Sequence, residues 1–151
     1  MPTATVVPRS LLSVEALLGG QGVLQAKPRS SMDWVAVIRR GIPAPAVQSL
    51  TKSLRMTQAE LATALGISER TLARRKREDT FNSEESAKLV RLARVVERAQ
   101  EVFEDFDAAL DWVKSPNAAL AGATPLSLLD IDMGAESVLD TLGRIEHGVF
   151  G

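Results

Sequence analysis

Three arginines offer the clearest chemistry in this sequence. Arg70, Arg74 and Arg77 stand at positions i, i+4 and i+7, so on a helix their side chains would share one face. An arginine on an exposed helix can hydrogen-bond guanine bidentately in the major groove of DNA, and it can neutralise a phosphate. The spacing therefore favours a DNA-binding surface over the alternative that it also allows, a helical hairpin with a solvated basic face.

The residues before these arginines have the order that a helix-turn-helix corner requires. Thr57 and Glu60 match the capping box that starts a helix, and Gly66 stands where the turn needs a positive φ. Ile67 would fill the angle between the two helices, and Ser68 would cap the second helix. We therefore expect a helix-turn-helix whose second helix carries the arginines.

The candidate DNA-binding residues come from both helices of this corner. Gln58, in the first turn of the leading helix, could contact a phosphate there or simply face solvent. Arg75 stands where many such motifs keep a second apolar residue, which leaves open which side chains reach the bases. The predicted set is Gln58, Ser68, Glu69, Arg70, Arg74, Arg75 and Arg77. Two copies in a homodimer would bind two half-sites of operator DNA and so gain specificity.

Charge is unevenly distributed along the chain. The 151 residues have a formal net charge of −1, but residues 1–100 carry 16 Lys or Arg and 9 Asp or Glu, whereas residues 101–151 carry 2 and 10. A basic front and an acidic back indicate either two partners of opposite character or an interface between the two halves.

The composition excludes several classes of function. The chain has no Cys and no Tyr, its one histidine is His147, and it has no Gly-rich phosphate loop. We therefore expect no enzyme, no catalytic residue, no metal site and no cofactor. No apolar run approaches the ~18 residues of a membrane span, and the N-terminus lacks the regions of a signal peptide, so we expect a cytoplasmic protein.

Helical periodicity extends over most of the chain. No segment alternates apolar and polar residues as a strand would, so we predict an all-α fold. Residues 1–31 mix Pro, Gly, Ser and Thr with short apolar pieces, and we interpret them as a flexible or partner-dependent arm. Residues 32–82 would form the helix-turn-helix domain, and residues 83–151 would form a second helical domain.

The long helix that we expect Ser83 to cap has a heptad-like apolar stripe. Its members recur at alternating spacings of three and four residues: Leu89, Leu92, Val96, Ala99, Phe103 and Phe106. Such a stripe occurs in an antiparallel helix pair, along the seam of a dimer, or on the core-facing side of a helix within one domain.

Several motifs along the chain match a known pattern. They are LGISERTL at residues 65–72, RRK at 74–76, Trp112, SPNAALAG at 115–122, TPL at 124–126 and RIEHGV at 144–149. Together they resemble the Xre/MbcA/ParS antitoxin family over about residues 32–151. The resemblance implies that residues 83–151 bind a toxin and dimerise.

The same resemblance implies a partner and a mechanism. A protein of this kind is the antitoxin of a type II toxin–antitoxin system, and its partner is a RES-domain toxin that degrades NAD. Its C-terminal region would block the active site of the toxin, and its helix-turn-helix would repress its own operon. The residues alone also fit a plain helix-turn-helix transcriptional repressor with a helical dimerisation domain and no toxin partner.

The candidate toxin-binding residues lie at the C-terminus. A toxin that binds NAD must hold a pyrophosphate with cationic groups, so an acidic domain with a protruding end could occupy that pocket. Phe150 is a large apolar residue next to the end, where burial against a partner would explain it, although a frayed terminus is the alternative. His147 could instead cap the end of a helix. The predicted set is Arg144, Glu146, His147, Val149, Phe150 and Gly151.

Overall fold

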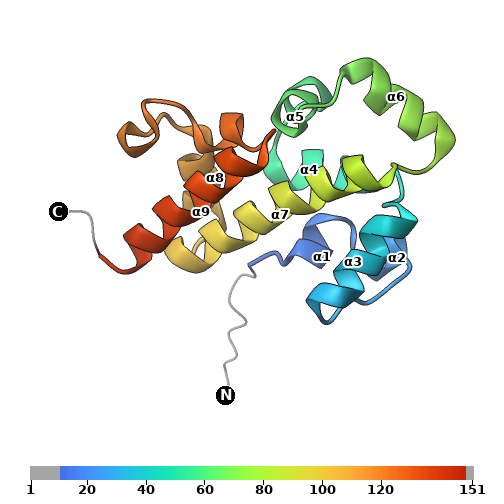
Figure 1. Ribbon diagram of the computed structural model, residues 1–151, viewed down its shortest axis with the longest axis horizontal. Coiled ribbons are helices and arrows are strands. Elements are labelled where there is room, and N and C mark those ends of the chain that lie inside the picture. The colour runs from blue at the N-terminus through green and yellow to red at the C-terminus, as the bar shows by residue number, and fades with distance from the viewer. Residues whose placement is uncertain (1–10, 149–151) are drawn as a thin grey trace.

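The computed structural model describes residues 11–148, and helices form almost all of their regular structure (Figure 1). The elements are α1 (Val14–Leu17), α2 (Gly20–Leu24), α3 (Ser31–Arg40), α4 (Ala46–Leu54), α5 (Gln58–Leu65), α6 (Glu69–Glu78), α7 (Ser83–Phe103), α8 (Phe106–Lys114), the 3-10 helices η1 (Ala118–Leu120) and η2 (Pro125–Leu128), and α9 (Asp132–Glu146). Between residues 11 and 148 no strand forms, and a single β-bridge pairs Pro43 with Thr80. The predicted all-α fold is confirmed. Within the same residues, no helix combines the length and the apolar character needed to cross a membrane.

The helix-turn-helix corner forms where the sequence predicts it. Thr57 caps α5 with both hydrogen bonds of the capping box: Glu60 N donates to Thr57 Oγ1 (3.0 Å), and Thr57 N donates to Glu60 Oε1 (2.8 Å). Gly66 has a φ of 67°, a conformation that strains residues with a side chain. Ser68 caps α6 by accepting a hydrogen bond from Thr71 N. Local sequence signals thus determine both sides of the turn.

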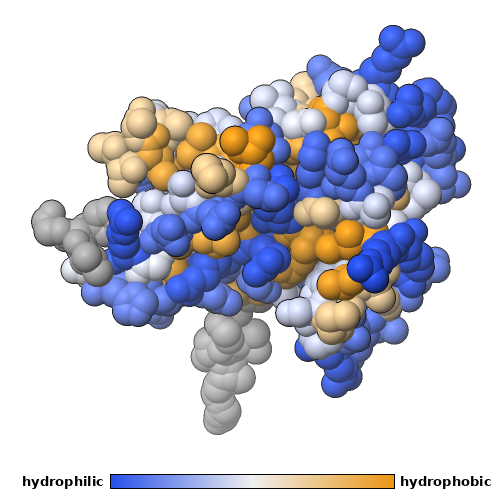
Figure 2. Space-filling model, in the orientation of Figure 1, coloured by the Kyte–Doolittle hydropathy of each residue, from blue (hydrophilic) through white to orange (hydrophobic). Residues whose placement is uncertain are grey.

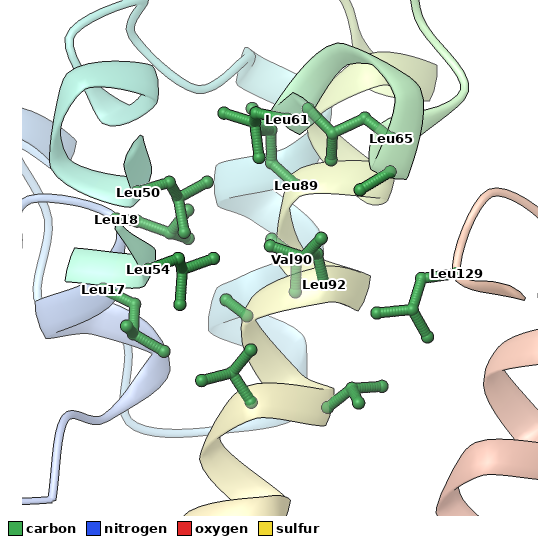
Figure 3. Close-up of a cluster of buried hydrophobic side chains, with 14 of the residues drawn as sticks. Leu17, Leu18, Leu50, Leu54, Leu61, Leu65, Leu89, Val90, Leu92 and Leu129 are labelled. Carbon is green, nitrogen blue, oxygen red and sulfur yellow. The ribbon is translucent and has the colours of Figure 1, made fainter. Parts of the chain in front are cut away.

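The long helix α7 is the axis of the molecule. Figure 1 shows it with α4, α5 and α6 on one side of its first half, α1, α2 and α3 on the other side, and α8 and α9 along its second half. Four members of its apolar stripe are buried in the core of the chain: Leu89, Leu92, Val96 and Ala99. In Figure 3, Leu89 and Leu92 lie among leucines of α4 and α5, with Leu129 on the far side. The stripe is therefore the core-facing side of α7.

The stripe does not continue in one helix beyond α7. The helix ends at Phe103, Glu104 takes a left-handed φ of 54°, and the side chain of Asp105 then caps α8. Phe103 is half-buried, and the centroid of its ring lies 5.8 Å from that of Trp112. At the other end, Asn82 rather than the expected Ser83 caps α7. The turn at residues 104–105 lets α8 pack back against α7.

Residues 11–31 differ from the predicted arm. Three of their leucines are fully buried in the core: Leu17, Leu18 and Leu24. Their backbone is also joined to α7, because Leu12 N donates to Gln100 Oε1 (2.6 Å) and Val14 N donates to Glu97 Oε2 (3.0 Å). For residues 11–31, local composition shows the Gly and Pro residues of the segment but not the surface of α7 that covers its leucines.

A short backbone pairing closes the helix-turn-helix domain. Phe81 N donates to Ile42 O (2.9 Å), and Ala44 N donates to Asp79 O (2.9 Å). The pairing returns the chain after α6 to the connection between α3 and α4. Ser86 of α7, which is fully buried, accepts a hydrogen bond from Ile42 N (2.8 Å). The start of α7 is therefore joined to the same connection.

Candidate functional site

One face of α6 is basic and exposed. Leu72 is the one fully buried residue of this helix, and Arg70, Arg74 and Arg77 lie on the opposite side. None of the three arginines forms an ion pair with another described residue. The surface over α6 is hydrophilic in Figure 2, at the upper right. The helix therefore presents three guanidinium groups to solvent.

The other candidates on the corner occupy the first turns of its two helices. Ser68 is used as the cap of α6: its Oγ accepts from Thr71 N (3.0 Å) and donates to Thr71 Oγ1 (2.9 Å). Glu69 is exposed in the first turn of α6, and Gln58, the first residue of α5, is half-buried. Both helix starts carry amide groups that are suited to bind phosphate.

Arg75 does not lie on the exposed basic face of α6. Its side chain turns toward α7 and is only 19% exposed, because its guanidinium pairs with Glu85 and with Glu78. Burial raises the pKa of the Glu85 carboxyl, but hydrogen bonds from Arg75 and from Asn82 N outweigh that effect and leave this pKa below its ordinary value. The hydrogen bonds to Glu85 and Glu78 raise the pKa of Arg75. The structure does not bring Arg75 together with the other candidate DNA-binding residues.

The candidate toxin-binding residues fall into two groups. Val149, Phe150 and Gly151 lie outside the described residues. Glu146, in the last turn of α9, forms an ion pair with Arg98 of α7. His147 Nδ1 lies 2.7 Å from Gly143 O, so the imidazole contacts a carbonyl at the end of the helix, as the capping interpretation expects.

Arg144 is exposed on the outer side of α9. It lines a shallow cavity of about 400 Å³ together with Asp140 and His147, and a second one of about 370 Å³ together with Ser137 and Leu120. The guanidinium of Arg144 makes no ion pair with any residue between 11 and 148. Arg144 therefore faces solvent on this side of α9.

The two halves of opposite charge also meet each other within the chain. Three ion pairs join a cation of residues 1–100 to a carboxylate of residues 104–151, which follow α7: Arg55 with Asp107, Arg91 with Asp132, and Arg98 with Glu146. A further contact joins the two halves, because Lys114 Nζ donates to Leu54 O of α4 (2.6 Å). The charge division in the sequence allows either two partners of opposite character or an interface between the halves, and these contacts form such an interface. Which residues pair could not be read from the sequence, because the partners are 41 to 60 positions apart.

Comparisons with known families divide the chain within α7. The antitoxin Xre-like helix-turn-helix domain matches residues 33–94, and the antitoxin Xre/MbcA/ParS C-terminal toxin-binding domain matches residues 98–148. The first match contains the corner and the basic face of α6. The second contains the end of α7, α8, both 3-10 helices and α9.

Individual relatives support the same assignment. The chain is 36% identical over 115 residues to the antitoxin Xre of Yersinia enterocolitica, a match that covers 75% of this chain and 78% of that protein. It is 27% identical over 131 residues to a protein of Sphingobium sp. named Prs ADP-ribosylating antitoxin, covering 80% of this chain and 82% of that protein.

A solved structure also resembles the chain. One chain of the M. tuberculosis MbcT-MbcA toxin-antitoxin complex superposes with a TM-score of 0.53 at 27% identity, covering 72% of this chain and 96% of that one. The helix-turn-helix, the C-terminal helical domain and these relatives agree. The chain is an antitoxin with a helix-turn-helix domain and a C-terminal toxin-binding domain, and it belongs to the Xre/MbcA/ParS antitoxin family.

Proposed function

We propose that this antitoxin neutralises a RES-domain toxin, which degrades NAD, by blocking the toxin's active site with its C-terminal region. We further propose that a homodimer binds operator DNA through α5 and α6 and so represses the antitoxin's own operon. The observation that carries the proposal is the division of the molecule: an exposed basic helix lies at one end of α7 and an acidic helical domain at the other.

The DNA-binding part rests on the geometry of α6. Its three exposed arginines share the face opposite Leu72, and the helix follows a turn in which Gly66 has the required positive φ. Guanidinium groups on such a face suit both phosphate and the guanine edge in the major groove. The starts of α5 and α6 add backbone amides that favour anions.

The toxin-binding part rests on charge and on the end of α9. A protein that binds NAD must hold its pyrophosphate with cationic groups, and residues 101–151 carry 10 acidic against 2 basic residues. One relative is named an ADP-ribosylating antitoxin, and ADP-ribosylation consumes NAD. Residues 149–151 directly follow α9 and Gly148, so they start from the exposed end of the domain that matches the toxin-binding family.

Removing residues 149–151 tests the blocking mechanism. In cells that also express the toxin gene beside this one, we expect the truncated antitoxin to let growth arrest return, and we expect the purified mixture to consume NAD. The control is the melting temperature of the truncated chain, and an unchanged value would show that the loss of neutralisation does not come from unfolding. Growth that continues, together with an inactive toxin, would show that another part of the domain blocks the active site.

A pull-down with the full-length antitoxin tests the identity of the partner. Recovery of a stoichiometric protein with NAD-consuming activity supports the RES-domain toxin. Recovery of a toxin without that activity contradicts the proposed toxin class, and recovery of no stoichiometric partner favours a plain transcriptional repressor.

Substitutions on α6 test operator binding. With a duplex taken from the DNA upstream of the antitoxin gene, Arg70→Ala and Arg74→Ala should each weaken binding about 10-fold, the usual size of one lost base contact. Arg94→Ala is the matched control, because Arg94 is an exposed cation of α7 that lines a groove with α1 and α3, away from α6. Equal affinities for all three variants would contradict the assignment of α6.

The proposed homodimer needs a surface other than the apolar stripe of α7. Its members Leu89, Leu92, Val96 and Ala99 are buried within one chain, so they cannot also form a seam between two chains without unfolding. Analytical ultracentrifugation over a range of protein concentrations tests the assembly. A monomer at every concentration, with and without the duplex, would contradict the homodimer.

A further inference from the structure

The second helix of the corner is attached to the core at few points. Leu72 is the one residue of α6 that is fully buried, whereas α5 buries four residues. A helix attached at one point can pivot about that point, so a second contact has to set its direction. Arg75, one turn further along α6, makes such a contact with α7.

The contact is an ion pair with two parallel hydrogen bonds. Arg75 Nε donates to Glu85 Oε1 (2.7 Å), and Arg75 Nη2 donates to Glu85 Oε2 (3.0 Å). Only 19% of the Arg75 side chain and 11% of the Glu85 side chain are exposed. Two bonds between planar groups determine both the distance and the direction between them. Because the pair is shielded from solvent, salt should screen it only weakly.

Glu85 is itself held in place at the start of α7. Its Oε1 also accepts a hydrogen bond from Asn82 N (3.0 Å), and its backbone N donates to Asn82 Oδ1 (2.8 Å). These are the two bonds of a capping box, so the carboxylate is attached to the first turn of the longest helix. The ion pair therefore connects α6 to a fixed point.

The guanidinium of Arg75 is already bonded to carboxylates and is therefore poorly available to DNA. Its Nη1 donates to Glu78 Oε1 (2.8 Å), so each of its three nitrogens already donates to a carboxylate. Two carboxylates beside one guanidinium leave this group of side chains with no net positive charge. The three exposed arginines of α6, by contrast, have no such partners among residues 11–148.

We propose that Arg75 is a positioning residue that sets the orientation of α6 against α7 and does not itself contact DNA. The inference rests on the proposed DNA binding and differs from the sequence prediction, which placed Arg75 among the DNA contacts. The Arg75–Glu85 pair takes the place of the second apolar contact that many such motifs use between these helices.

If Arg75 has this positioning role, its removal should lower the sequence specificity of DNA binding. The positive charge that α6 presents to the duplex should stay the same. Hydrogen bonds to base edges require a fixed geometry, whereas attraction to phosphate depends mainly on the number of cations near the duplex. If α6 can pivot about Leu72, Arg70 and Arg74 lose their alignment with the bases but keep their charge. Removing Arg75 should therefore reduce discrimination between sequences and leave the salt dependence of binding unchanged.

Three variants test this distinction on two duplexes, one from the DNA upstream of the antitoxin gene and one of shuffled sequence. We expect Arg75→Ala to lower the ratio of the two affinities about 10-fold, the size of one lost base contact, with an unchanged slope of log affinity against log salt. Arg74→Ala removes a cation that faces the duplex, so the magnitude of its slope should fall by about 0.9. Glu78→Gln, which alters only the exposed partner of Arg75, is the control and should leave both quantities near their wild-type values.

A double variant tests whether Arg75 acts by orienting α6 or by its positive charge. Arg75→Leu with Glu85→Leu replaces the ion pair by an apolar contact between the same two helices, a replacement that is often neutral for stability. We expect this variant to recover most of the affinity ratio lost in Arg75→Ala although it has no cation at this position. A smaller salt slope in Arg75→Ala, or a double variant that discriminates as poorly as Arg75→Ala, would overturn the proposal.

A measurement without DNA separates this inference from the proposed function. Hydrogen exchange of the α6 amides should be about 10-fold faster in Arg75→Ala than in Glu78→Gln, while the amides of α9 keep their wild-type rates. A wild-type chain that binds both duplexes equally contradicts the proposed operator binding. Unchanged exchange of α6 in Arg75→Ala contradicts the positioning role, whatever the DNA measurement shows.

Discussion

Arg98 of α7 and Glu146 of α9 form a bidentate ion pair, so the end of the toxin-binding domain is attached to the helix that also supports the helix-turn-helix. Two nitrogens of the guanidinium each meet one carboxylate oxygen, and Arg98 also pairs with Glu101 (3.3 Å). The hydrogen bonds from Arg98 hold the pKa of Glu146 below its usual value. Glu146, a candidate for direct toxin contact, is thus engaged within the chain.

Breaking this pair should loosen the last turn of α9. In Glu146→Ala we expect faster hydrogen exchange over residues 143–148 at pH 7, with little change in the midpoint of unfolding because the pair is partly exposed. Because the folded-state pKa of Glu146 is lowered, the pair contributes above the ordinary pKa of a glutamate and is lost as the pH falls through the lowered value. The difference between variant and wild type should therefore vanish in acid.

The control for that experiment is Glu136→Ala, an exposed carboxylate of α9 with no ion pair inside the described part of the chain. Equal exchange rates in both variants at pH 7 would mean that Arg98 does not hold the end of α9.

Gly134 allows α9 to start close to η2. A Cβ added at Gly134 would overlap Leu128 O, which is a backbone atom and cannot move alone. We expect Gly134→Ala to lower the free energy of unfolding by about 1–3 kcal/mol, the range for an overpacked site. Gly143→Ala, on the same helix but with no atom near its added Cβ, should instead raise it by about 0.5–1 kcal/mol. Urea unfolding measures both, and similar values for the two variants would contradict the close approach.

The side chain of Ser86 accepts a hydrogen bond from a buried backbone amide. Its Oγ accepts from Ile42 N (2.8 Å), and both residues are fully buried. Ser86→Ala leaves that N–H without an acceptor and should cost about 1–3 kcal/mol in urea unfolding. Ser137→Ala, at an exposed position of α9, is the matched control and should change little. A loss no larger than that of the control would show that Ile42 N finds another acceptor.

The Arg75–Glu85 pair should make part of the stability depend on pH. The pKa of Glu85 is lowered in the folded state, so its contribution is fully present above the ordinary pKa of a glutamate and is lost as the pH falls through the lowered folded value. We expect Glu85→Gln to be less stable than wild type at pH 7 and to approach wild type near pH 2. A constant difference at both pH values, measured by urea unfolding, would argue against a charged pair.

The helix-turn-helix could be predicted from the sequence because its signals are local. A capping box at Thr57 and Glu60, a glycine at the turn and a cap at Ser68 each act within four residues. The outward direction of Arg70, Arg74 and Arg77 follows from helical spacing once α6 is placed. The all-α class follows in the same way, from periodicity.

The features that sequence reasoning missed depend on distant contacts. Leu17 and Leu24 are buried because α7 and the elements around it cover them, which no local pattern records. Arg75 stands at a usually apolar position of α6, and this was the signal in the sequence that it differs from the other arginines. Its pairing with Glu85, ten residues later on another helix, could not be predicted from local pattern.

The length of α7 has a further consequence for assembly on DNA. A helix of 21 residues is roughly 30 Å long, close to the pitch of one turn of a DNA duplex, roughly 34 Å. If α6 binds operator DNA as proposed, a toxin held at the end of α9 would lie toward the other end of α7 from the bases. Antitoxins on successive operator sites would then carry their toxins in a row, and the operator sequence would set the spacing of that row.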